Sequence, residues 1–158
     1  MKKNNKSTFF KRVLISVVML LCLSALNAYA GDGKDIVDQV GRFVEYLEGE
    51  KFEKRIGGVM IDRLNKDSNP TRSYTRTLYK GNTYVALATS GKGINDIDLI
   101  VYRKSGSNWI QLDKDTDNSD VAVVEFECTA TGQYKFEIKG YSYETNITEA
   151  FFGFILAF

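Results

Sequence analysis

The sequence predicts a mainly β protein, an antiparallel β-sandwich with an N-terminal amphipathic helix packed on one sheet. From Arg72 onward, short β-branched and aromatic runs alternate with Gly, Asn and Asp turn residues, which favours a sandwich over βαβ units. One stretch before them has helical periodicity. Several of the expected strands are apolar on both faces, so an outer cover is needed, and that helix is available to provide it.

The first 30 residues have the pattern of a secretory signal peptide. A basic end precedes an apolar run from Val13 to Leu26, and Ala28-Tyr29-Ala30 is a small-x-small cleavage site. The apolar run is shorter than the roughly 20 residues that a membrane span needs. We therefore predict cleavage after Ala30 and a periplasmic or secreted protein with no transmembrane span.

Composition excludes two classes of function. Residues 31–158 contain 16 Lys and Arg against 20 Asp and Glu, a net charge of −4 with no basic stripe, so nucleic acid is not an expected partner. The chain has no histidine and no Gly-x-Ser-x-Gly motif. Cys128, the single cysteine after residue 30, lies on the apolar face of an expected strand and has no basic partner that would activate it. We expect a protein that is not an enzyme.

Residues 31–70 form the expected N-terminal helical segment. Apolar residues recur at helix spacing between Ile36 and Leu47. A second apolar stripe between Phe52 and Leu64 is weakened by Gly57-Gly58. The run Asp67-Ser68-Asn69-Pro70 ends the segment as a loop.

Residues 71–158 form the expected β-sandwich domain. One of its strands alternates apolar and charged residues around Phe136, so one of its faces is wet. Three others, at 85–87, 99–102 and 151–158, are apolar on both faces. The expected strands are 73–80, 83–89, 97–103, 109–112, 121–128, 133–139 and 151–158.

A succession of motifs in this region resembles a known family. DIDLIVY at 96–102 is followed by a Gly turn, a return strand that ends in LDKDTDNSD, then VVEF and TGQYKFEIKG. Over about residues 73–158 this order is similar to the bacterial pre-peptidase C-terminal domain. The resemblance implies a jelly-roll-like sandwich, which in this family is usually appended to secreted hydrolases or stands alone in exported proteins.

Acidic residues bracket the central hairpin of this domain. Asp96 and Asp98 enter it, and Asp113, Asp115 and Asp117 leave it, so both groups are expected at one end of the sheet. Carboxylates at alternate positions suit Ca²⁺, although the spacing does not fit an EF-hand, and some members of the resembling family bind calcium. The alternative is a solvated loop whose carboxylates accept hydrogen bonds from backbone N–H groups. The pair at the hairpin entry also allows acid–base chemistry.

Three aromatic residues are candidate ligand contacts. Trp109 opens a strand after a turn, and Tyr141 and Tyr143 follow Gly140 in a stretch that reads as a loop. Packing in the core or at a sheet edge is the alternative. The sequence predicts an exported, non-catalytic binding or accessory module whose partner is a protein, a glycan or an envelope component. The alternatives are a structural or assembly protein of the envelope, and a small carboxylate-based hydrolase.

Overall fold

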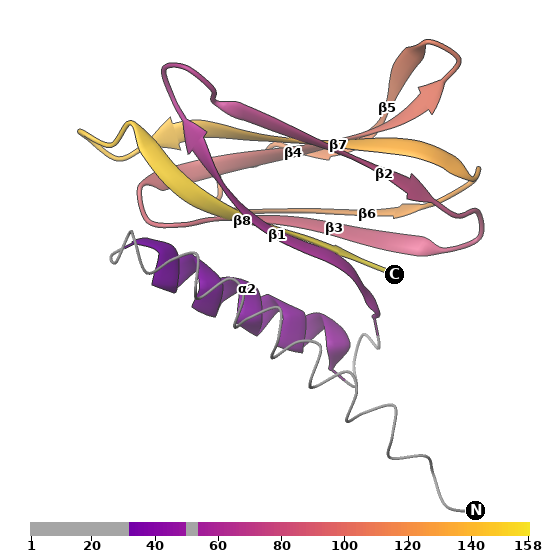
Figure 1. Ribbon diagram of the computed structural model, residues 1–158, viewed down its shortest axis with the longest axis horizontal. Coiled ribbons are helices and arrows are strands. Elements are labelled where there is room, and N and C mark those ends of the chain that lie inside the picture. The colour runs from indigo at the N-terminus through magenta and orange to yellow at the C-terminus, as the bar shows by residue number, and fades with distance from the viewer. Residues whose placement is uncertain (1–31, 50–53) are drawn as a thin grey trace, which may run out of the picture.

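The computed structural model describes residues 32–49 and 54–158, so the predicted signal peptide lies outside the described residues. The described residues form two packed antiparallel sheets with a helix on one of them (Figure 1). Among them, no helix is long and apolar enough to cross a membrane. The elements are α2 (Asp32–Glu48), β1 (Ile56–Asn65), β2 (Thr71–Leu78), β3 (Thr83–Ser90), β4 (Ile94–Ser105), β5 (Asn108–Asp115), β6 (Val121–Glu127), β7 (Gly132–Tyr143) and β8 (Glu149–Ala157).

The strand order is that of a jelly roll. The sheet that we call sheet A has the order β1-β8-β3-β6, and sheet B has the order β2-β7-β4-β5. All neighbouring strands pair antiparallel, and successive strands of the chain mostly cross from one sheet to the other. The predicted fold class, a jelly-roll-like sandwich with a helix on one sheet, is confirmed.

Aromatic side chains fill the space between the two sheets. Phe136 of sheet B and Phe154 of sheet A have ring centroids 5.2 Å apart, and Tyr74 stacks on Phe154 at 5.9 Å. Phe152, Tyr134 and Phe136 are fully buried. Such ring pairs stabilise a core beyond the area that they bury.

Helix α2 covers the outer face of sheet A. Its apolar stripe and the outward-facing residues of β3 and β8 form a second buried cluster. At Gly153 an added Cβ would overlap Val40 of the helix, so the absence of a side chain allows the helix to approach β8 closely. The predicted packing of the helix is confirmed. The cluster comprises Ile36, Val40, Val44 and Leu47 from the helix, and Val85, Leu87, Ile155 and Ala157 from the sheet.

The expected N-terminal helical segment is shorter than 31–70. The described helix ends at Glu48, and Ile56–Asn65 form the edge strand β1, paired with β8. The pair Gly57-Gly58 disfavours a helix. It lies where the β1–β8 register shifts, and the flexible glycine backbone accommodates this irregularity of the strand. The sandwich therefore starts at residue 56 rather than at 71. A second difference concerns β7, which continues to Tyr143 where a loop was expected.

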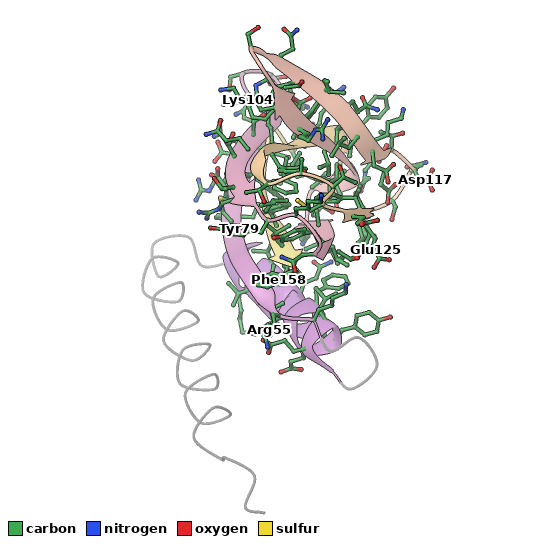
Figure 2. All side chains as sticks on the ribbon, turned by 90° about the vertical axis from the view of Figure 1, so that its right-hand side faces the viewer. Arg55, Tyr79, Lys104, Asp117, Glu125 and Phe158 are labelled. Atoms are coloured by element: carbon green, nitrogen blue, oxygen red, sulfur yellow. The ribbon has the colours of Figure 1, made fainter. Side chains whose placement is uncertain are left out.

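The β4–β5 hairpin extends past the body of the sandwich (Figure 1). Its closing pair is Ser105 and Asn108, and Gly106 between them has a φ of 59°, a conformation that glycine adopts without strain. Figure 2 shows Lys104 beside this turn, at the opposite end of the view from Arg55 and helix α2. The outer face of sheet B carries no described helix.

Candidate functional site

The two acidic groups predicted to meet do lie at one end of sheet B. Asp96 and Asp98 on β4 line a hollow together with Thr116 and Asn118 from the loop that follows β5. Tyr141 and Ser142 of β7 complete its wall. The register of β4 against β7 shifts on both sides of Asp96, so the strand is irregular where the hollow forms.

The two carboxyl groups of the hollow are largely removed from water. Asp96 and Asp98 are 7% and 9% exposed, and Asp96 Oδ1 has no hydrogen-bond partner among the described residues. Burial raises the pKa of Asp98, and the charge of Asp96 raises it further, while Lys139 opposes the shift. The hollow therefore holds two carboxyl groups close together, and for Asp98 the ionised form is disfavoured.

Asp115 joins the edges of the two sheets instead of pointing into the hollow. One oxygen of its carboxylate accepts a hydrogen bond from the Asp117 N–H at 3.1 Å, and the other accepts from the Val123 N–H of β6 at 2.8 Å. This is the arrangement that the backbone-capping interpretation of the loop predicts. Across residues 32–49 and 54–158, no group of three acidic, His or Cys side chains could hold a metal ion. A calcium site that draws on Asp96, Asp98, Asp113, Asp115 and Asp117 stays a prediction.

A second cluster lies on the outer face of sheet B, near the β4–β5 turn. We call it the ring-and-lysine face, and it comprises Tyr102, Lys104, Trp109, Lys135 and Glu137. Directly paired residues of antiparallel strands share a face of the sheet, and Tyr102 pairs with Lys135 while Lys104 pairs with Trp109. Lys135 Nζ lies 4.1 Å from the centroid of the Tyr102 ring and 5.8 Å from that of Trp109. Lys104 Nζ lies 5.9 Å from the Trp109 ring.

Glu137 holds this cluster in place. Its carboxylate pairs with Lys135 Nζ at 3.1 Å and accepts a hydrogen bond from the Tyr102 hydroxyl at 3.4 Å. Burial, and then the charge of Glu137, raise the pKa of Tyr102, so its hydroxyl keeps its proton at neutral pH. The Lys135 side chain is 20% exposed. The face therefore presents two rings and an ammonium group whose positions are fixed before any ligand arrives.

The three aromatic residues predicted as ligand contacts occupy different surroundings. Trp109 is half-buried on the ring-and-lysine face. Tyr141 is 67% exposed at the rim of the acidic hollow, with Lys139 Nζ 5.0 Å from its ring centroid. Tyr143 packs against the core and lies over Gly140, where an added Cβ would overlap its ring. Of the three, Trp109 and Tyr141 are the ones that a ligand can reach.

The sequence interpretation missed Tyr102, Lys104 and Lys135 as members of a site. Tyr102 and Lys135 belong to predicted strands, and Lys104 lies one residue beyond the predicted end of its strand. The cluster forms only through pairing of β4 with β5 and with β7. The alternation around Phe136, which assigns Lys135 and Glu137 to a wet face, is the signal that could have found them.

No protein-family model and no curated protein matches the chain. Among solved structures, the fold is similar to the pre-peptidase C-terminal domain of a collagenase from Bacillus anthracis. That match has 12% identity and a TM-score of 0.47, and it covers 63% of this chain and 87% of that one. The family that the sequence resembles is thus among the structural matches.

Two further matches are similar in extent. A periplasmic inhibitor of g-type lysozyme from Aeromonas hydrophila has 11% identity and a TM-score of 0.43, and the match covers 63% of this chain and 83% of that one. The Yersinia pseudotuberculosis-derived mitogen has 17% identity and a TM-score of 0.32, with coverage of 54% and 83%. All three similarities concern the sandwich fold.

Proposed function

We propose that this protein is an exported, non-catalytic binding module that contacts a component of the bacterial envelope or secretome through the outer face of sheet B. One observation carries the proposal. Helix α2 covers the outer face of sheet A, whereas the outer face of sheet B holds Tyr102, Trp109 and Lys135 with no described element over them. Rings and charges arranged on an uncovered surface are typical of recognition sites.

The chemistry of the face supports binding rather than catalysis. Its titratable groups are lysines, a tyrosine whose pKa is raised, and Glu137, which is already paired with Lys135. A general base must be free to accept a proton from a substrate, and Glu137 is instead held in an ion pair and a hydrogen bond. The face can hold a ligand by stacking, by charge and by hydrogen bonds.

Affinity capture from an envelope extract tests the proposal. The purified protein and its Trp109→Ala variant are immobilised in parallel, together with Tyr46→Ala as a control that removes an exposed ring from helix α2. We expect the wild type and Tyr46→Ala to retain the same component, and Trp109→Ala to lose it. Equal retention by all three proteins would contradict a binding role for this face and would favour a structural or assembly role.

A further inference from the structure

We infer that the ring-and-lysine face binds an anionic polysaccharide. The inference rests on the proposed function and specifies its ligand. Three features of the outer face of sheet B lead to it: its local charge, the spacing of its rings and cations, and the hydroxyl and amide groups beside them.

The outer face of sheet B is basic on an acidic protein. Residues 31–158 have a net charge of −4, with 16 basic against 20 acidic residues. By register, this face carries four lysines against two carboxylates, Glu137 and the buried Asp98. Local positive charge on a protein of negative net charge attracts an anionic partner to one place and repels it elsewhere. The lysines are Lys104, Lys114, Lys135 and Lys139.

Part of this charge is available to a ligand. Lys135 is paired with Glu137, and the charges of Lys139 and Lys114 act on the carboxyl group of Asp98, which is the cross-strand partner of Lys139. Lys104 forms no ion pair with a described carboxylate. Lys104 lies near the Trp109 ring and Lys139 near the Tyr141 ring, so aromatic faces orient these ammonium groups. An ammonium group that is held in place and lacks a counter-ion is a ready contact for a carboxylate or a sulfate.

The rings and their neighbours suit a sugar chain better than an acidic peptide. The C–H face of a pyranose ring packs on an aromatic ring, and its hydroxyl groups pair with hydroxyl and amide side chains. Thr75, Thr77 and Gln133 supply such groups on the same face, and Gln111 pairs directly with Tyr102. A peptide would dock best as an added strand, which sheet B allows only at its edge strands β2 and β5, because β4 and β7 already pair on both of their sides. A strand added at β5 would lie beside Trp109 and would not cover Tyr102 and Lys135 on β4 and β7.

Trp109 makes the inference directly testable because it is the only tryptophan of the chain. Its fluorescence is followed while the purified protein is titrated with polygalacturonate, a polyanionic sugar chain. Parallel titrations use dextran, polyglutamate and vesicles that contain an anionic lipid. We expect polygalacturonate alone to change the Trp109 emission, with an affinity that falls as salt is added.

Lysine variants locate the binding. Lys104→Gln and Lys135→Gln should each weaken the binding of polygalacturonate about threefold, and the double variant about tenfold. Lys66→Gln, which removes an exposed lysine from the turn between β1 and β2, should bind as the wild type does. Lys104 lies beside the exposed hairpin turn, so its variant keeps the test valid if Lys135→Gln fails to fold.

The other outcomes contradict the inference in distinguishable ways. An equal response to dextran would indicate a neutral sugar, an equal response to polyglutamate an acidic peptide, and an equal response to vesicles a lipid surface. If no probe changes the emission but the envelope capture still depends on Trp109, the ligand class is wrong and the proposed function stands. If the capture also shows no dependence on Trp109, both are wrong.

Discussion

The two outer faces of this sandwich differ in composition and in what covers them. Over β3 and β8 the outer face of sheet A is apolar, with Val85, Leu87 and Ile155 buried under helix α2. The outer face of sheet B is built from lysines, threonines and rings, and no described element covers it. Both sheets share one core, so the difference between their outer faces is not required by the sandwich itself. It indicates that one face serves stability and the other is free to serve recognition.

The largest effect should follow from breaking the covered face. Val40 is 4% exposed between helix α2 and sheet A. Because Val40→Asp places a carboxylate in this apolar layer, we expect it to lower the free energy of unfolding by about 3–5 kcal/mol, measured by urea denaturation. Glu45→Asp introduces the same residue on the exposed side of the helix as a control. If both variants unfold at the same urea concentration, helix α2 does not stabilise the sandwich.

A smaller effect should follow from adding one methyl group under the helix. The Cβ of Gly153→Ala would meet Val40 Cγ2, so we expect a loss of about 1–3 kcal/mol. Adding Val40→Ala makes room for that methyl group, so the double variant should lose less than the sum of the two single changes. Gly132→Ala is the control, because an added Cβ there meets open space. Strict additivity would show that the helix does not rest on Gly153.

The arrangement of the covered face could be predicted from sequence, but that of the open face could not. The apolar stripe from Ile36 to Leu47 needs an apolar surface to pack on, and strands that are apolar on both faces need a cover. The packing of helix on sheet therefore follows from local sequence patterns. The open face depends on which strands become neighbours, which a single sequence does not specify. Lys135 meets Tyr102 only because β7 pairs with β4. The β1 strand was missed because Gly57-Gly58 interrupts its apolar pattern, and its extended conformation depends on pairing with β8.

Asp115 offers a test at the boundary of the two sheets. Its carboxylate accepts hydrogen bonds from the backbone of Asp117 and of Val123, so Asp115→Ala should cost about 1 kcal/mol in urea denaturation. Asp117→Ala should cost less, since only the backbone of Asp117 takes part. The same proteins melted in chelator and in Ca²⁺ test the predicted metal. A rise in melting temperature with Ca²⁺ that Asp115→Asn removes would show that the loop binds the ion.

The pH dependence of stability tests whether the carboxyl group of Asp98 is buried or solvated. The pKa of Asp98 is raised by burial and by Asp96, so between its ordinary and its raised value the folded state binds more protons than the unfolded state. Its contribution to stability therefore falls as the pH rises through that window. We expect Asp98→Asn to melt above the wild type at neutral pH, and the difference to vanish in acid. If Asp98→Asn melts below the wild type at neutral pH, the charged form of Asp98 does not destabilise the folded protein, and the expectation is wrong.

The central claim, that the face of sheet B is open, is tested most directly by acrylamide quenching of Trp109. As the only tryptophan, it reports on this face alone. We expect the folded protein to be quenched readily, at a rate of the same order as the urea-unfolded protein, and Val40→Ala under helix α2 to leave that rate unchanged. Emission that resists acrylamide until the protein unfolds would show that the ring-and-lysine face is covered, and would contradict the account.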